Sequence, residues 1–419
     1  MNKPVIVVHY HELWLKGRNR NFFLAKLSLA LRRALDGLSI TRIGRPGDRM
    51  LIELDDAAHL PEAIERLKRV SGISSFAVAQ PVERDLDAMC RAAWEEVAPE
   101  KFSSFAVRAK RSDKSFPHNV VTIERKVGGH VLDQLRAAGR DVRVDLNHPE
   151  LTCRIEIPPG PSALVYARRI AGTGGLPPNT GGRMLCLLSG GFDSAVAAWK
   201  MMKRGAHVTF AHFYGGGARP GESSVHVARE LVRTLTPWQF TSKLFLVPFE
   251  EIQREIVHAA PETFRLLLYR RLMLRIAEQL ARRDHALAIV TGDSLGQVAS
   301  QTLKNMVAVG DCARLPVFRP LAGDDKIEII DIAKRIGTHD ISAEPFHDCC
   351  PVFLPKVPAL HATIADLDAA EATLDVRALV RRGVESAQTE RFRFSAGRVE
   401  SVVASLESLQ ANRFENLKA

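Results

Sequence analysis

The sequence lacks a long apolar run, and it has few cysteines. No apolar run approaches the ~18 residues that a membrane-spanning helix needs. The N-terminus enters a strand-like segment at once, without the apolar core or the small-residue cleavage site of a secretion signal. The six cysteines show no spacing typical of a disulfide framework. These absences predict a cytoplasmic protein of a reducing compartment, with no membrane partner.

The composition favours a multidomain protein with a polyanionic partner. With 419 residues, of which 46% are hydrophobic, the chain can bury the cores of two or three domains. Its 58 Lys and Arg residues exceed its 48 Asp and Glu residues, and such an excess favours nucleic acid because each phosphate contact releases counterions. Part of this excess lies in the N-terminal half, at residues 16–20, 108–114 and 168–169.

The N-terminal half alternates the strand and helix patterns of two small α+β modules. In the first module, residues 4–10 and 50–54 predict strands, and residues 21–35 predict a helix because apolar residues recur at every fourth position from Phe23 to Leu35. The second module has strand patterns at 73–79, 105–109, 142–146 and 151–157 and helix patterns near 85–97 and 118–138.

Residues 171–182 form the clearest boundary, because five glycines and two prolines in twelve residues cannot form a packed element.

Beyond residues 171–182, continuous apolar runs alternate with helical patterns, which predicts a parallel sheet covered by helices on both faces. Apolar residues of 399–409 fall on one helix face and predict a packed terminal helix. Strands are expected at 184–188, 207–213, 243–248 and 286–291, and helices near 194–204, 222–235 and 262–283.

The segment Ser-Gly-Gly-Phe-Asp-Ser at 189–194 is the most informative motif. It follows a buried-strand pattern and opens a helix pattern, so the free N–H groups of the turn and the helix start form a nest for an anion. Two adjacent glycines allow positive φ and a close approach of the backbone to a ligand. No Gly-Lys-Ser/Thr follows, which excludes a Walker-type loop. A simple glycine turn with a serine cap is the alternative interpretation.

Other polar residues should meet this turn, because ligands of a doubly wound sheet bind at the carboxyl ends of its strands. His212 and Phe213 end the second strand, Gly292 belongs to a turn after a later strand, and Arg270 lies on the helix before that strand. Each residue alone also fits a structural role, as a strand-end, turn or surface residue.

Asp193 and Lys326 are the charged candidates for the same site. Asp193 is suited either to ligate Mg²⁺ or to orient the nest, and the alternative is a first-turn acid favoured by the helix dipole. Lys326 is suited to neutralise charge that develops on phosphates, and the alternative is a solvated lysine.

Cys349 and Cys350 are adjacent and precede a proline, which predicts a loop. A loop cysteine near a histidine and a basic surface can have a depressed pKa and act as a nucleophile. The pair lacks the Cys-x-x-Cys spacing of a structural zinc site. An iron–sulfur cluster completed by a distant cysteine, or two incidental thiols, are the open alternatives.

Together, these motifs resemble the ThiI-type tRNA sulfurtransferases, the 4-thiouridine synthases, over residues 1 to about 360. The turn at 189–194 resembles the PP-loop of ATP pyrophosphatases, which transfer AMP to a substrate oxygen. The matching segments are 9–23, similar to the family's Glu-x-x-Leu-Lys-Gly-x-Asn-Arg element, 107–117 and 127–129, which resemble a THUMP domain, and 292–303 and 319–321.

The resemblance implies an α/β protein whose PP-loop parallel-sheet domain, adenine nucleotide alpha hydrolase-like, follows α+β ferredoxin-like and THUMP domains. The N-terminal domains would hold the acceptor region of tRNA, and the PP-loop domain would activate the uridine at tRNA position eight. The implied boundaries are 1–60 for the ferredoxin-like domain, 61–170 for THUMP, 171–182 for a linker, 183–360 for the PP-loop ATP pyrophosphatase domain and 361–419 for a C-terminal helical extension.

The resemblance also implies ATP and Mg²⁺ as cofactors and assigns the site residues. Asp193 and Lys326 would support adenylation. Cys349 lies at the family's spacing from Lys326 and would be the catalytic cysteine, and Cys350, one residue beyond that spacing, is the second candidate. ATP would contact Leu187, Leu188, Ser189, Gly190, Gly191, Asp193, Ser194, His212, Phe213, Arg270, Gly292 and Gln301, and tRNA would contact Lys16, Arg18, Arg20, Arg108, Lys110, Arg111 and Lys114.

The implied reaction has two steps: uridine O4 attacks the α-phosphate of ATP, and a sulfur donor then attacks C4 and displaces AMP. Only about 60 residues, none of them cysteine, follow Pro358, which is too short for the rhodanese domain of many members. Sulfur would therefore come from a cysteine desulfurase, a separate rhodanese or a cluster, and the thiamine role of rhodanese-bearing members is not implied. Family behaviour suggests a homodimer.

The rival interpretations are the same fold with an iron–sulfur cluster, a non-catalytic tRNA-binding THUMP protein, and a small-metabolite ligase, which the basic N-terminal half disfavours.

Overall fold

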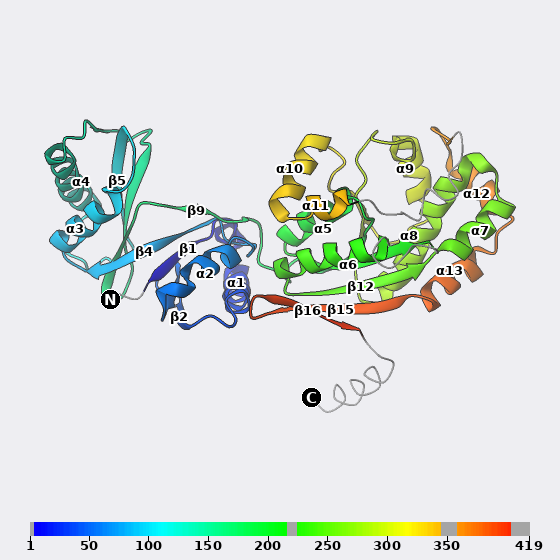
Figure 1. Ribbon diagram of the computed structural model, residues 1–419, viewed down its shortest axis with the longest axis horizontal. Coiled ribbons are helices and arrows are strands. Elements are labelled where there is room, and N and C mark those ends of the chain that lie inside the picture. Colours follow the sequence, from blue (N-terminus) through cyan, green and yellow to red (C-terminus); the bar gives the residue numbers. More distant parts are fainter. Residues whose placement is uncertain (1–3, 216–223, 345–357, 404–419) are drawn as a thin grey trace, which may run out of the picture. The chain divides into compact units, whose positions relative to one another are not determined.

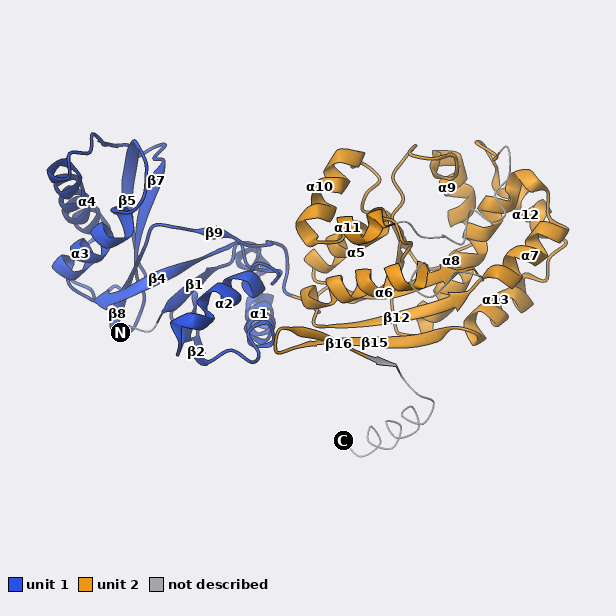
Figure 2. Ribbon diagram, viewed as in Figure 1, with its two compact units in different colours: residues 1–177 blue, residues 178–419 orange. Residues whose placement is uncertain are grey.

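The computed structural model describes residues 4–215, 224–344 and 358–403, which form two compact units (Figures 1 and 2). Unit 1 comprises residues 1–177 and unit 2 residues 178–419, and the division falls inside the segment 171–182. Cys349 and Cys350 lie outside the described residues. Within the described ranges, no helix is long and apolar enough to cross a membrane.

Unit 1 is built on a nine-stranded sheet in the order β2-β3-β1-β4-β8-β7-β5-β6, with β9 paired to β4. Its helical elements are η1 (Glu12–Asn19), α1 (Arg20–Ala34), η2 (Ala57–His59), α2 (Leu60–Leu67), α3 (Leu86–Val97) and α4 (Val120–Ala137). Its strands are β1 (Val5–His9), β2 (Ile40–Gly44), β3 (Met50–Leu54), β4 (Ser75–Glu83), β5 (Ser104–Arg111), β6 (Arg143–Val144), β7 (Leu151–Ile157), β8 (Ser162–Tyr166) and β9 (Ile170–Ala171).

Strand β4 belongs to both halves of this sheet. Residues 75–79 pair antiparallel with β1, and residues 80–83 pair antiparallel with β8. The two predicted α+β modules therefore share one continuous strand. The helix predicted from the apolar repeat of residues 21–35 is confirmed as α1, whose Leu27 and Leu31 are fully buried.

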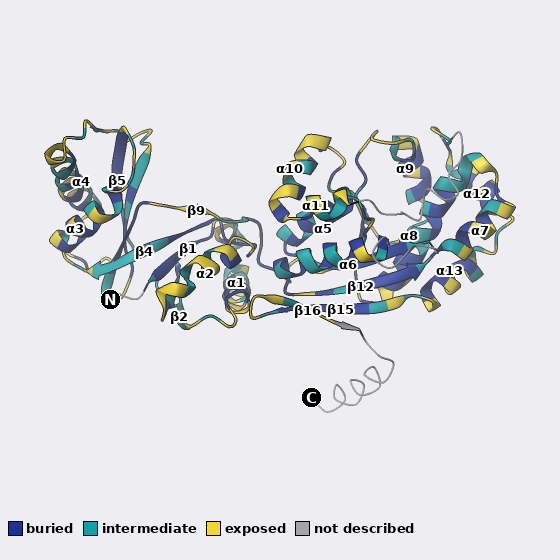
Figure 3. Ribbon diagram, viewed as in Figure 1, coloured by how far each residue is buried: buried dark blue, intermediate teal, exposed yellow. Residues whose placement is uncertain are grey.

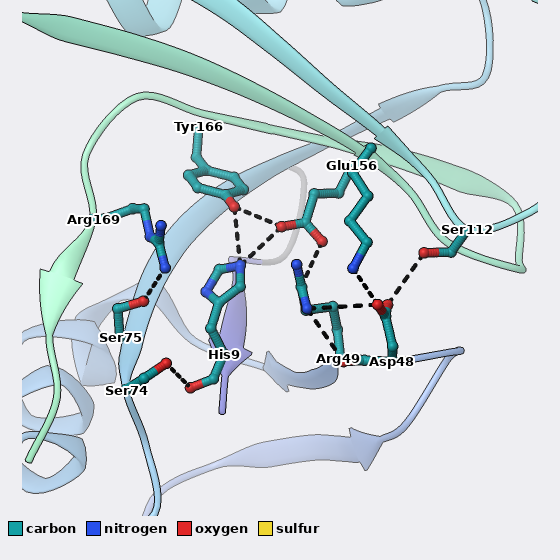
Figure 4. Close-up of polar contacts among 10 residues, drawn as sticks. His9, Asp48, Arg49, Ser74, Ser75, Ser112, Glu156, Tyr166 and Arg169 are labelled. Atoms are coloured by element: carbon teal, nitrogen blue, oxygen red, sulfur yellow. Dashed lines mark hydrogen bonds and ion pairs between the residues drawn. The ribbon is translucent and has the colours of Figure 1, made fainter. Parts of the chain in front are cut away.

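A buried polar cluster joins the two halves of unit 1 (Figure 4). Glu156 on β7 accepts hydrogen bonds from His9 on β1 (2.8 Å), from Tyr166 on β8 (2.7 Å) and from Arg49 Nε (2.9 Å). Burial alone would raise the pKa of Glu156, but the hydrogen bond from His9 and the charge of Arg49 outweigh burial and lower the pKa to about 2. Burial lowers the pKa of His9, which favours the neutral ring.

Unit 2 is built on a seven-stranded sheet in the order β14-β13-β10-β11-β12-β15-β16. The five strands from β14 to β12 are parallel, and β15 and β16 are antiparallel. The strands are β10 (Arg183–Leu187), β11 (His207–Tyr214), β12 (Thr241–Pro248), β13 (Ala288–Val290), β14 (Val317–Phe318), β15 (Gln388–Ser395) and β16 (Arg398–Val403). The helical elements are α5 (Phe192–Lys203), α6 (Ser224–Leu235), η3 (Thr236–Trp238), α7 (Glu250–Ala259), η4 (Glu262–Phe264), α8 (Arg265–Arg283), η5 (Ala299–Gln301), α9 (Leu303–Gly310), α10 (Lys326–Ile336), α11 (His339–Ala343), α12 (Ile364–Glu371) and α13 (Val376–Glu385).

Both faces of the parallel sheet are buried, as the continuous apolar strands predict. Successive strand residues face opposite sides, so Leu185 packs in a core with residues of α8, and Cys186 packs in a second core with residues of α5 and α6. In Figure 3 the sheet and α8 are largely buried, whereas α10 and α13 carry exposed residues.

The strand order places a switch point at β10. The chain runs from β10 to β11 and β12 on one side and then returns to β13 on the other side of β10. Ligands of open parallel sheets bind at such a point, beside the carboxyl ends of the strands.

The predicted helix over 399–409 is wrong where it can be compared, because residues 398–403 form strand β16. β16 pairs with β15 across a two-residue turn at Ala396 and Gly397, which both have positive φ (47° and 83°). Such a turn matches the twist of a hairpin. The hairpin adds to β12, and residues 404–409 lie outside the described part of the chain.

Candidate nucleotide site

The turn at 189–194 connects β10 to α5, as predicted. Its two serines hold it, because Ser189 N–H donates to Ser194 Oγ (3.0 Å) and the Ser194 hydroxyl donates to Gly191 O (3.1 Å). The positive φ that two adjacent glycines allow is not used here, since neither Gly190 nor Gly191 has left-handed backbone. Gly191 is the N-cap of α5, and no side chain of the described residues caps this helix. The first N–H groups of α5 are therefore suited to an anion.

A close approach of two backbones explains the glycine at 292. A Cβ added to Gly292 would lie 2.6 Å from Ser194 N and 2.8 Å from Ser194 Cα. Only glycine therefore lets the turn after β13 pack directly on the first turn of α5.

A cavity of about 220 Å³ opens at the carboxyl ends of β10, β11 and β13. Its wall is apolar where Ala211, Met273, Leu274 and Val309 lie, and polar near the turn at 189–194. It brings together most of the predicted ATP contacts, namely Leu187, Leu188, Ser189, Asp193, Ser194, Phe213, Arg270, Gly292 and Gln301, whereas Gly190, Gly191 and His212 do not line it.

His212 has a different position from the one predicted. Its Nδ1–H donates to Leu188 O (2.8 Å), and its Nε2 accepts from the Ser224 hydroxyl (2.9 Å). The ring is buried, with 1% of the residue exposed. His212 therefore braces the end of β10 instead of facing the cavity.

Asp193 and Lys326 meet at the mouth of the cavity. Lys326 Nζ lies 2.8 and 2.9 Å from the two carboxylate oxygens of Asp193 and 4.4 Å from the centroid of the Phe192 ring. Lys326 is the first residue of α10, whose start is fixed by a capping box of Asp325 and Glu328. Two residues 133 positions apart are thus held as an ion pair beside the anion nest.

Asp293 is a site residue that the sequence analysis missed. This buried carboxylate, with 5% of the residue exposed, forms an ion pair with Arg270 and accepts from Thr291 Oγ1 (2.8 Å), and Arg319 Nε lies 3.5 Å away. Burial alone would raise the pKa of Asp293, but the charge of Arg270 and the other donors outweigh burial and lower the pKa. Gln301 Nε2 also points at Asp293 (3.4 Å), and Gln301 Oε1 is buried without a hydrogen-bond partner among the described residues. Asp293 thus holds two arginines and a glutamine on the cavity wall.

The predicted tRNA contacts all lie in unit 1. Arg20 stacks on Trp14, with its guanidinium carbon 3.4 Å from the ring centroid. Lys110 forms an ion pair with Asp48, and Arg111 Nη1 donates to the carbonyls of residues 116 and 118 (2.9 and 3.1 Å). The remaining predicted contacts are Lys16, Arg18, Arg108 and Lys114, of which Arg18 and Lys114 are exposed.

Comparison with known proteins identifies the family. A relative from Thermus thermophilus named "Probable tRNA sulfurtransferase" is 44% identical over 380 residues, which cover 91% of this chain and 92% of the relative. The profile described as "Thiamine biosynthesis protein (ThiI)" matches residues 179–376. The chain belongs to the ThiI family. The profiles of the ThiI ferredoxin-like domain and of the THUMP domain match residues 5–77 and 83–160.

Other members agree with this ThiI assignment and with the fold. A "Probable tRNA sulfurtransferase" of Geobacillus kaustophilus is 40% identical over 391 residues, covering 93% of this chain and 96% of that protein. The solved structure described as "Crystal structure of a 4-thiouridine synthetase - RNA complex with bound ATP" superposes with a TM-score of 0.80 at 32% identity, over 93% of this chain and 100% of that chain. The predicted fold class, ferredoxin-like and THUMP domains followed by a PP-loop domain, is confirmed.

Proposed function

We propose that this ThiI-family chain is an ATP-dependent tRNA sulfurtransferase that makes 4-thiouridine. The observation that carries the proposal is the cavity at the β10 switch point, where the N-terminus of α5, the Asp193–Lys326 pair and Arg270 converge. The solved 4-thiouridine synthetase with RNA and ATP supports both ligands.

Different residues of the cavity have different roles in adenylation. The N–H groups at the start of α5 bind phosphate, and Lys326 and Arg270 stabilise negative charge that develops as uridine O4 attacks the α-phosphate and pyrophosphate leaves. Gln301 Oε1 is suited to accept a hydrogen bond from the ligand.

The residues also fit Mg²⁺, which binds through one or two carboxylates together with substrate phosphates. Among the described residues, no three His, Cys, Asp or Glu side chains form a cation cage, whereas Asp193 presents one carboxylate at the phosphate end. When bound, Mg²⁺ would neutralise phosphate charge, and Asp193 would hold it once Lys326 turns to the nucleotide.

Sulfur transfer completes the proposal. A persulfide sulfur from a separate cysteine desulfurase or rhodanese attacks C4 of the activated uridine, and AMP leaves. The Cys349 thiolate then attacks the persulfide S–S bond, which leaves sulfur on the base as 4-thiouridine and a disulfide between Cys349 and the donor cysteine. Cys350 is the second candidate for this role.

A single-turnover assay tests the function. The full chain is mixed with unmodified tRNA, ATP, Mg²⁺, a cysteine desulfurase and cysteine, and AMP and 4-thiouridine are measured for wild type, Cys349→Ser and Cys350→Ser. The proposal expects 4-thiouridine from wild type and its loss only in Cys349→Ser. AMP release without 4-thiouridine in wild type would reject direct delivery by the desulfurase, and a visible absorption spectrum after anaerobic purification would then test for a cluster. No AMP from wild type would reject the function.

A further inference from the structure

A second, strongly basic groove of about 730 Å³ lies in unit 2 between α8, α13 and the segment after α9. Six of its lining residues are arginines and one is an acid. The lining is Arg275, Glu278, Gln279, Arg282, Arg283, Cys312, Arg314, Val376, Arg377, Val380, Arg381 and Val384.

Two acidic residues at the groove, Glu371 and Glu278, are engaged by its arginines. Glu371 binds Arg275 through both oxygens (2.6 and 2.8 Å). Glu278 accepts from Arg282 (2.7 Å) and from the backbone N–H of Arg314 (2.7 Å). The charge of the groove arginines that do not pair with these two carboxylates is uncompensated by them.

Four groove arginines have no carboxylate within salt-bridge distance among the described residues: Arg283, Arg314, Arg377 and Arg381. Arg377 and Arg381 are both exposed and stand one helical turn apart on α13. Like charges at this spacing destabilise a helix by a few tenths of a kcal/mol. A polyanion bound in the groove would remove this repulsion.

The chemistry of the lining favours nucleic acid over protein. Guanidinium forks match phosphate oxygens in pairs. Cores of protein–protein interfaces are instead depleted of charge and rich in aromatic residues, and none of the three groove valines is among the exposed large apolar residues.

The groove and the nucleotide cavity are lined by successive stretches of the same helix, α8. Arg270, Met273 and Leu274 line the cavity, and Arg275 and Gln279 line the groove. Five residues of helix separate Arg270 from Arg275, a rise of about 7.5 Å. We propose that this groove binds the phosphate backbone of the RNA substrate and so holds RNA on the catalytic unit itself. This proposal rests on the proposed function.

The test measures binding of fluorescently labelled, unmodified tRNA to the full chain across a salt series. The variant is Arg377→Ala with Arg381→Ala, and the matched control is Lys334→Ala with Arg335→Ala, which removes the same charge from exposed positions in the last turn of α10. Each lost phosphate contact lowers the log–log salt slope by about 0.7–0.9. We expect the groove variant to lose about 1–2 from the slope and about 10- to 50-fold in affinity near 0.1 M salt, with the control unchanged. Arg377→Lys with Arg381→Lys should restore most of the slope.

The outcomes separate this proposal from the proposed function. If wild type forms 4-thiouridine but the groove variant binds tRNA as the control does, the groove proposal is overturned. If the groove variant binds tRNA normally but requires a higher concentration of the sulfur donor to form 4-thiouridine, the groove binds the donor protein. This outcome also overturns the groove proposal. If wild type neither binds tRNA nor releases AMP, the proposed function itself fails. ATP affinity and a thermal melt, measured for every variant, show that unit 2 is folded.

Discussion

Replacing Glu156 with glutamine should destabilise unit 1 in a pH-dependent way. The substitution keeps the shape of the side chain but removes the charge that Arg49 neutralises and that His9 and Tyr166 donate to. The pKa of Glu156 falls from 4.5 to about 2, and each tenfold change in the proton affinity of a group corresponds to about 1.4 kcal/mol. The carboxylate therefore contributes about 3 kcal/mol to folding at pH 7.

Because the pKa of Glu156 is lowered on folding, the stability that its carboxylate contributes decreases as pH falls. A carboxyl with a depressed pKa contributes its full stability above pH 4.5 and loses it as pH falls toward 2. Wild type should exceed Glu156→Gln by about 3 kcal/mol at pH 7 and by roughly half of that at pH 3. Burial lowers the pKa of His9, so His9 adds a further loss of stability in wild type as pH falls below 6.5.

Hydrogen exchange followed by mass spectrometry measures this effect in the full chain, because peptides of unit 1 and unit 2 are read separately. Glu83→Gln is the matched control, since Glu83 is exposed at the end of β4 and loses the same charge. Equal protection of wild type and Glu156→Gln at pH 7, or a difference that does not change with pH, would refute the reasoning.

Three further predictions concern the two ligand sites. Asp193→Ala should abolish pyrophosphate release while tRNA affinity stays within about twofold, and unaltered turnover would remove Asp193 from the mechanism. Gly292→Ala places a Cβ 2.6 Å from a backbone nitrogen of the α5 start and should weaken ATP binding at least about tenfold by calorimetry, whereas Gly323→Ala, with open space around its Cβ position, should not. Lys110→Ala with Arg111→Ala should weaken tRNA binding and flatten its salt slope by about 1–2, and an unchanged slope would place the RNA contacts elsewhere. A thermal melt of this last variant is needed, since both side chains also bind within unit 1.

Local patterns made much of this fold predictable. The strand, glycine turn and helix at 184–204 depend on neighbours in sequence, and the structure confirms them as β10 and α5. Asp293 was not predictable in the same way, because its role depends on Arg270 and Arg319, which the fold brings from α8 and from the segment after β14. No local pattern marks such a meeting.

Two differences between prediction and structure, the position of His212 and the strand at 398–403, have signals in the sequence. Strand alternation puts Phe213 on the cavity side and His212 on the opposite side of β11, so the two residues could not both face one ligand. Residues 390–394 alternate buried and exposed positions and end before Ala396 and Gly397, which is a hairpin signal. Helical spacing of the following valines obscured it.

The shared strand β4 has a consequence for folding during synthesis. Its partners β8 and β9 are made 79 to 88 residues later, counted from Glu83 to Ser162 and to Ala171. At about 5–20 residues per second, β4 waits about 4–18 s with one edge unpaired. An open strand edge invites pairing with other chains. The nascent first module should therefore depend on chaperones until the end of the THUMP region emerges from the ribosome.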